Sequence, residues 1–250
     1  MTRNLLRRSV ALAAVCLVGL SGLTACQTQA GVAAFVGTQR ITEDTVRKLS
    51  DDGLAVRSIS QQVGGNVAGY RQLILSRLVR RELIDGAARK LRVSASNGDL
   101  DQNVTGTTKQ FGGQKQIDEA LAQLRLPPGE LRPFLRELLL MQKIGEKLTE
   151  GTTFTDAELK KYYDEHGGSA NGPFEPLKAE IAKILLQPQA AQKAQDYVDK
   201  YLSSVRLKVN PRYGRLDRSK LFDRQNSSIA PAPDALVRDV PVKVTPSPST

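Results

Sequence analysis

The stretch from Asn66 to Leu91 constrains the fold more than any other part of this 250-residue chain. Its apolar residues recur at steps of three and four, the spacing of one face of an α-helix; they are Tyr70, Leu73, Ile74, Leu78, Leu83, Ile84, Ala87, Ala88 and Leu91. Leu75 and Val79 lie off this face, so the helix is apolar on more than one side. We expect such a helix to be buried on more than one side and to form the central scaffold.

Five arginines lie on the polar side of this predicted helix: Arg71, Arg77, Arg80, Arg81 and Arg89. One hypothesis makes them a basic recognition face. The other makes them a solvated face, in which long side chains cover the edges of the core while their charges stay in water. We expect the solvated face.

Before this helix, the short apolar run Val32–Val36 ends at Gly37-Thr38 and leads into Arg40-Ile41. An apolar run closed by a turn predicts a strand. Thr42 then suits a helix N-cap, because two acids follow it in the first turn. We expect that helix to end near Gly53.

After the central helix, capping residues and Gly or Pro breaks predict four more helices. They cover about residues 96–111, 116–124, 133–148 and 155–166, and Ser96–Asp99 resembles a capping box at the start of the first. In the second of these, Ile117, Leu121 and Leu124 should face inward. The fourth begins with a capping box, formed by Thr155 and Glu158.

A last apolar stripe runs from Leu177 to Val205 and includes Ala191 and Ala194. Pro188 within it predicts either two helices or one bent helix. The β-like run Arg206–Val209 follows. Residues Gln225–Thr250 are rich in Pro, Ser and Thr and lack long periodicity, which predicts a disordered tail. The fold class is therefore mainly α, an α+β protein with little β-structure.

The N-terminus has the layout of an export signal, with three arginines before an apolar run from Val10 to Leu20. The stretch Leu23-Thr24-Ala25-Cys26 resembles a bacterial lipobox. The resemblance implies cleavage between Ala25 and Cys26 and a diacylglycerol on the Cys26 thiol. Residues 1–25 would then be the signal peptide and residues 26–31 a lipidated tether. The alternative is an ordinary signal peptide with an incidental Cys.

The sequence offers no catalytic or metal constellation, and we expect neither a metal nor another cofactor. The chain has one His, His166, and the only Cys after the signal, Cys26, would carry the lipid. With no second His and no free Cys, we expect neither a zinc cluster nor a Cys–His pair. Its net charge is +10, or +7 once the three signal arginines are removed. Because an exported protein rarely meets nucleic acid, the expected counterparts are anionic lipid head groups, anionic envelope polymers or acidic polypeptides. The alternative is that the net charge of +7 only keeps the protein soluble.

Three segments in this order resemble the SurA N-terminal-like family of exported chaperones. They are Ala34–Thr42, the Tyr-Tyr helix in Phe154–Tyr163, and Val209–Gly214, which is similar to the actinobacterial branch. The resemblance implies a helical core like those of SurA and trigger factor over residues 32–216. In it, a C-terminal helix over residues 175–205 packs back on the N-terminal part. A short sheet of two or three strands joins the N- and C-terminal segments.

The sequence differs from the family pattern in one respect that determines which function we expect. Family members with isomerase activity carry a parvulin domain of roughly a hundred residues after the Tyr-Tyr helix, whereas here only His166–Pro173 follow before the next helix. We therefore expect a lipid-anchored chaperone on the extracytoplasmic face of the bacterial membrane that binds unfolded or exported polypeptides without catalysis. The alternatives are an envelope assembly lipoprotein with one folded partner and, third, a peptidyl-prolyl isomerase. The sequence does not specify the polypeptide-binding residues.

Overall fold

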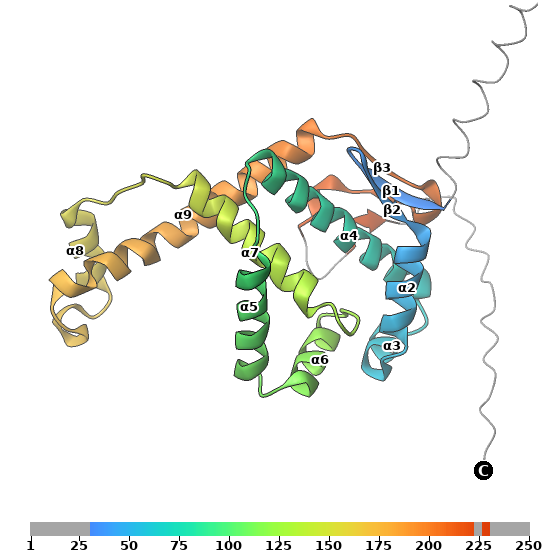
Figure 1. The fold of residues 1–250 in the computed structure, drawn as a ribbon, viewed down its shortest axis with the longest axis horizontal. Helices are drawn as coiled ribbons and strands as arrows, with labels where there is room; N and C mark the ends of the chain where they lie inside the picture. The colour runs from blue at the N-terminus through green and yellow to red at the C-terminus, as the bar shows by residue number, and fades with distance from the viewer. Residues whose placement is uncertain (1–30, 223–226, 231–250) are drawn as a thin grey trace, which may run out of the picture.

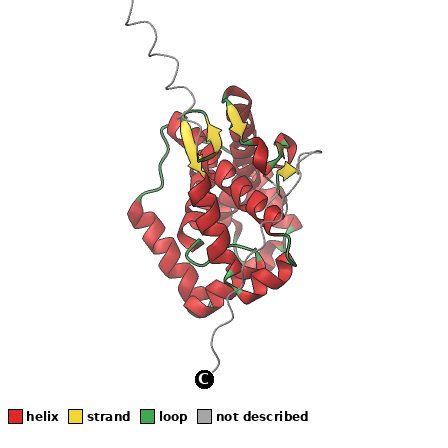
Figure 2. Ribbon diagram, turned by 90° about the vertical axis from the view of Figure 1, so that its right-hand side faces the viewer, coloured by secondary structure: helices red, strands yellow, loops and turns green. Residues whose placement is uncertain are grey.

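The computed structural model describes residues 31–222 and 227–230, and within them the fold is mainly helical with a small antiparallel sheet. Figure 1 shows an elongated molecule in which a body of helices carries the sheet at one end and an arm projects from the other. Figure 2 shows the strands gathered at one edge of the helices. The signal sequence, Cys26 and most of the predicted tail lie outside the described residues.

The three-stranded sheet joins an N-terminal and a C-terminal segment of the chain, as predicted. Strand β1 (Val32–Val36) lies between β2 (Gln39–Thr42) and β3 (Leu207–Val209), and both pairings are antiparallel. Ala34 pairs with Ile41 on one side and with Val209 on the other. A segment from after the last long helix therefore completes the N-terminal hairpin.

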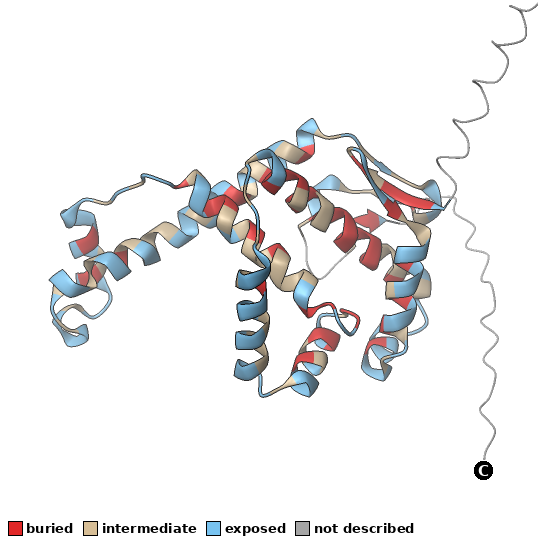
Figure 3. Ribbon diagram, viewed as in Figure 1, coloured by how far each residue is buried: buried red, intermediate tan, exposed pale blue. Residues whose placement is uncertain are grey.

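Helix α4 (Val67–Lys90) is the central element, confirming the prediction for Asn66–Leu91. Asn66 caps it by accepting a hydrogen bond from the backbone of Gly69 at 2.9 Å. Leu75 and Val79, which lie off the main stripe, are fully buried, and every residue of the stripe except the half-buried Leu91 is buried as well. Figure 3 shows the buried residues concentrated along α4 and the sheet.

The helices around α4 follow the predicted order, with one addition. They are α2 (Glu43–Leu54), α3 (Arg57–Val63), α5 (Asn97–Gln110), α6 (Gln114–Gln123), α7 (Leu131–Leu148), α8 (Asp156–Glu165) and α9 (Phe174–Ser204). The addition is α3, a seven-residue helix whose buried residue is Ile59 and which was not predicted from the sequence. The predicted caps Thr42 and Ser96 and the capping box of Thr155 and Glu158 are all present.

One expectation about a side chain was wrong. Leu124 does not face inward but is 45% exposed, because α6 ends at Gln123 and the buried position passes to Leu126. Of the two alternatives that Pro188 left open, the structure has the single helix: α9 contains Pro188 and extends over 31 residues. Ile144 and Leu140 of α7 pack against Ala194 and Val198 of α9, and this contact stabilises the second half of the helix.

The arm consists of α8 and the first half of α9. It has its own small core, in which Leu159 and Tyr163 pack against Ile181. The capping box fixes the start of α8, and residues 166–173 join it directly to α9 through a short 3₁₀ turn (Gly168–Asn171). Within residues 31–222 and 227–230, no helix combines the length and apolarity that a bilayer span requires.

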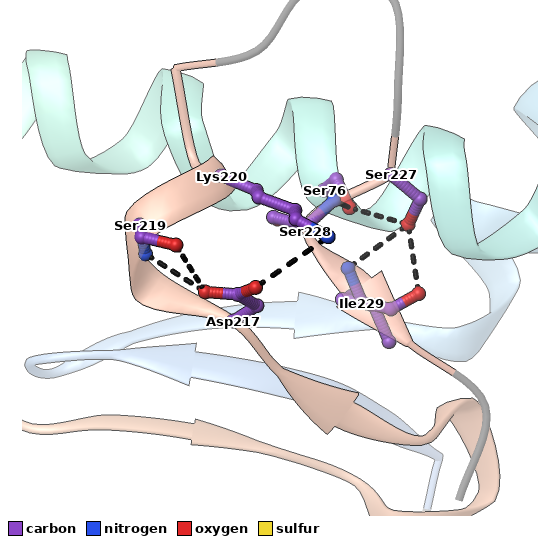
Figure 4. A network of polar contacts seen from close by, with 7 residues as sticks. All are labelled: Ser76, Asp217, Ser219, Lys220, Ser227, Ser228 and Ile229. Atoms are coloured by element: carbon purple, nitrogen blue, oxygen red, sulfur yellow. Dashed lines mark hydrogen bonds and ion pairs between the residues drawn. The ribbon is translucent and has the colours of Figure 1, made fainter.

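Part of the predicted disordered tail belongs to the fold, and that part of the prediction was wrong. Strand β5 (Ile229–Ala230) pairs antiparallel with β4 (Arg215–Leu216) and lies against α4. Ser76 of α4 accepts a hydrogen bond from the backbone of Ser228 at 3.0 Å and contacts the Ser227 hydroxyl at 3.0 Å (Figure 4). Residues 227–230 form a strap across the central helix.

Ile229→Ala is expected to lower the free energy of unfolding by about 2–3 kcal/mol, because the Ile229 side chain is only 1% exposed and its removal leaves a cavity. Urea unfolding followed by circular dichroism measures this loss. Ile184→Ala is the control, since Ile184 is 39% exposed and should cost less than about 1 kcal/mol. Equal, small losses in both variants would show that the strap does not pack on α4.

Candidate functional site

Helices α7 and α9 cross in backbone contact at Gly145. A Cβ atom added to Gly145 would lie 2.6 Å from the backbone oxygen of Ala190, so only glycine permits this approach. Ala194, one turn further along α9, is fully buried in the same contact. The residues at this crossing are small. Small side chains at the contact allow a short distance between the axes of two crossed helices.

A groove of about 780 Å³ opens beside this crossing. Apolar atoms contribute most of its lining. The residues from α7 are Met141, Gln142, Glu146 and Thr149, and those from α9 are Lys183, Leu186, Gln187, Ala190, Ala191, Ala194 and Gln195. Its size lies within the range of about 300–1,000 Å³ typical of binding clefts.

The groove has an apolar floor and a polar rim. Ala194 is buried, Met141, Leu186 and Ala190 are half-buried, and Ala191 is exposed. Leu186 belongs to none of the packed apolar clusters of the described residues, so its side chain is available to a ligand. On the rim, the Gln142 amide donates to Glu146 at 2.8 Å. This arrangement suits an apolar segment whose backbone or polar side chains meet the rim.

A buried ion pair places α7, one wall of the groove, against α4. Arg80 Nε donates to Glu137 Oε1 at 2.9 Å, and the two side chains are 6% and 4% exposed. Arg81 Nη2 pairs with Glu130 Oε2 at 2.5 Å at the start of α7, and Arg136 pairs with Asp85. Because such charges tolerate burial only when paired, α7 has one stable position on α4.

The expected solvated arginine face was therefore wrong for Arg77 and Arg80, which are both buried. Arg77 donates to the backbone oxygen of Arg125 at 2.7 Å and to that of Leu124. Burial, with a smaller contribution from neighbouring Arg80, lowers the pKa of Arg77 to about 10. The alternative of a basic recognition face fails for the same two residues, since their guanidinium groups bind within the protein.

Tyr70 completes this anchorage of the loop between α6 and α7. Its hydroxyl donates to the Arg125 oxygen at 3.2 Å, and burial raises its pKa to about 12. Arg125 has φ of 54°, a left-handed conformation that is uncommon for residues other than glycine. Hydrogen bonds from α4 thus fix a strained loop directly before α7 and the groove.

The arm offers a second, smaller hollow on α9. It has a volume of about 230 Å³ and lies between α8 and α9, with Ile184 at its edge. Pro188 has no backbone N–H, so the carbonyl of Ile184 lacks that helical donor. An exposed apolar side chain and a backbone carbonyl that lacks its usual helical donor therefore occur together in the lining of this smaller hollow.

The remaining candidate residues do not converge on a catalytic centre. His166 caps α8, stacks on the Tyr162 ring at 3.8 Å between centroids and has Nδ1 2.8 Å from the Tyr162 backbone oxygen. The part of the chain that the structure describes contains no group of His, Cys, Asp and Glu residues suited to a metal ion. Cys26, the predicted lipidation site, lies outside the described residues. The groove residues were not singled out from the sequence, although Ala191 and Ala194 were assigned to the apolar stripe of the last helix.

Comparison with known proteins points to one family. The family model for the SurA-like N-terminal domain matches residues 5–145. A protein named foldase protein PrsA from Clostridium acetobutylicum is 22% identical over 177 residues, covering 65% of this chain and 52% of that protein. Another of the same name, from Caldanaerobacter subterraneus subsp. tengcongensis, is 27% identical over 109 residues, covering 44% of this chain and 29% of that protein. The chain thus spans about half the length, or less, of these relatives.

Proposed function

This chain belongs to the SurA-like N-terminal domain family, and from that premise we propose that it is a membrane-anchored extracytoplasmic chaperone. It binds unfolded or exported polypeptides in the groove between α7 and α9 and performs no covalent step. The observation that carries the proposal is the groove itself, which is largely apolar and about 780 Å³ in volume. Both relatives are named foldases, which supports an action on polypeptides.

The binding mechanism is passive. Covering apolar surface of a client is worth about 25 cal/mol per Å², and the loss of translational and conformational freedom offsets most of that gain. Binding is therefore weak and exchanges rapidly, which lets a client leave and fold. The polar rim, with Glu146 on α7 and Lys183 on α9, contacts the polar groups of the bound segment.

The absence of catalysis is also part of the proposal. Helix α8 is joined to α9 by residues 166–173, in the place where isomerase-bearing members of the resembled family carry a parvulin domain. His166 is the only His in the chain and is engaged at the end of α8. The expected result is no acceleration of cis–trans exchange in a prolyl-peptide assay.

The test of the chaperone function is suppression of aggregation. The mature protein should suppress light scattering by a chemically denatured model enzyme at about one chaperone per client, without ATP. A second sample receives the same mass of serum albumin, which controls for nonspecific coating. Unchanged aggregation at several-fold excess over the client would refute the proposal.

Cys26→Ala is expected to abolish incorporation of radiolabelled palmitate and to move the protein out of the membrane fraction or leave it unprocessed. The reason is that the Cys26 thiol is the proposed attachment point of the lipid. The far-ultraviolet circular dichroism should not change, because residues 31–222 form the fold without this side chain. Palmitate-free wild-type protein would instead indicate an ordinary signal peptide.

A further inference from the structure

The outer face of the three-stranded sheet carries one aromatic ring between cations. Phe35, the fourth of the five residues of β1, pairs directly with Arg40 of β2 and with Lys208 of β3. Directly paired residues of antiparallel strands point to the same face of the sheet. The neighbouring pairs, which include Ala34 with Ile41, face the core. Phe35 is half-buried, whereas Arg40 and Lys208 are exposed.

Arg206 extends this cationic face. It precedes β3 by one residue, and its backbone oxygen accepts a hydrogen bond from Gly37 at 2.8 Å, so the pairing of the strands continues to this point. Side chains two residues apart on extended chain share a face, which places Arg206 beside Lys208. Residues 32–42 and 206–210, which form the sheet and its hairpin, contain no Asp or Glu.

The proposed lipid anchor lies close to the same face. Cys26 precedes Val32, the first residue of β1, by six positions, so fully extended chain keeps the sheet within about 20 Å of the anchor. We infer that the face formed by Phe35, Arg40, Arg206 and Lys208 rests on anionic lipid head groups. This inference depends on the anchor proposed above.

Membrane lipid is the occupant that the position and the chemistry favour. A single lipid chain gives only marginal membrane binding, and a basic patch is a common second signal. The cations contact phosphate groups, and the Phe35 ring lies at the level of the head groups, where aromatic side chains are favoured. An anionic envelope polymer would satisfy the charges but gives no reason for the face to lie next to the anchor.

The inferred contact involves one end of the molecule. The sheet and the arm lie at opposite ends of the long axis (Figure 1). None of the four residues of the cationic face lines the groove between α7 and α9. The lipid contact and the polypeptide-binding groove therefore use different residues.

Tryptophan fluorescence tests the inference, because the chain contains no Trp. Phe35→Trp and, at the exposed hairpin, Thr38→Trp place a single reporter on the sheet, and Phe111→Trp places one at the end of α5. The lipidated proteins are reconstituted in phosphatidylglycerol or phosphatidylcholine vesicles. The sheet reporters should shift to the blue and be quenched by brominated lipid only in phosphatidylglycerol, whereas the Phe111→Trp emission should not change. Thr38→Trp keeps the test valid if Phe35→Trp does not fold.

Charge variants in the same reporter background separate the cationic face from net charge. Replacing Arg40, Arg206 and Lys208 by Gln should abolish the shift, as should 0.5 M salt. Replacing Lys109, Lys115 and Lys161 by Gln removes the same charge elsewhere and should leave the shift intact. A shift that persists in the first variant would overturn the inference. A shift with soluble polyphosphate but not with phosphatidylglycerol vesicles would overturn it as well.

Palmitate labelling of the same preparation reports separately on the anchor. Labelled protein whose sheet reporters do not respond to phosphatidylglycerol overturns the lipid contact and leaves the anchor standing. Unlabelled protein whose sheet reporters still respond overturns the anchor and supports the contact.

Discussion

Glu137→Ala is expected to lower the free energy of unfolding by about 3–5 kcal/mol, the typical cost of removing one partner from a buried ion pair. The Glu137 carboxylate is 4% exposed and accepts from Arg80 Nε at 2.9 Å. Without it, Arg80 would remain buried beside Arg77, whose pKa burial and Arg80 already lower. Since domains are stable by only about 5–15 kcal/mol, the loss would be a large share of the total.

Urea unfolding of the wild type and of two reference variants measures this effect. Replacing Arg80 by Met and Glu137 by Leu together should recover most of the loss, because it removes both charges and fills the space with apolar atoms. Glu119→Ala removes a partner of an exposed pair, at 4.0 Å from Lys115, and should cost less than about 0.5 kcal/mol. A cost for Glu137→Ala as small as that for Glu119→Ala would contradict the buried pair.

The sequence was sufficient to predict the elements whose signals are local. The stripe of α4 has the period of a helix over 24 residues, and its off-stripe Leu75 and Val79 correctly indicated burial on more than one side. Thr42, Ser96 and Thr155 act within their own first turns, so the starts of α2, α5 and α8 could be located from sequence alone. The family resemblance supplied the pairing of β3 with β1, which connects segments about 175 positions apart.

Long-range partners explain what the sequence did not reveal. Arg80 looks like a surface residue until Glu137, 57 positions later, lies next to it. Ile229 lies in Pro-rich sequence, and it joins the core through its pairing with Leu216 and the contact of β5 with α4. Leu124 fits the stripe of α6, but the helix ends just before it. None of these facts has a periodic signal along the chain.

The groove could not be predicted from the sequence for a related reason. A helical stripe marks every apolar residue on a face as core, including residues that the facing helix does not cover. Ala191 and Ala194 share the stripe of α9, yet Ala194 is fully buried at the crossing with α7 and Ala191 is exposed in the groove. The close contact at Gly145 determines which part of the apolar face of α9 is covered by α7.

Ala191→Glu is the second large expected effect, a loss of about tenfold in affinity for an unfolded polypeptide. It places a carboxylate in the groove, and covering an unpaired polar group with apolar client surface costs about 1–3 kcal/mol; 1.4 kcal/mol corresponds to a factor of ten. Because Ala191 is exposed, the substitution should leave the unfolding midpoint nearly unchanged.

Gln192→Glu is the matched control for this variant. It adds the same charge at the adjacent position of α9, and Gln192 is exposed but does not line the groove. Its affinity should stay within about twofold of the wild type, a difference well below 1.4 kcal/mol. A loss shared equally by both variants would indicate a general electrostatic effect on acidic segments of the client.

Fluorescence anisotropy tests most directly whether polypeptides bind in the groove. A fluorescently labelled, permanently unfolded polypeptide is titrated in turn with the mature wild type, with Ala191→Glu and with Gln192→Glu. The predicted result is saturable binding to the wild type, similar binding to Gln192→Glu and about tenfold weaker binding to Ala191→Glu. Binding of equal strength to all three proteins would show that polypeptides do not occupy the groove between α7 and α9.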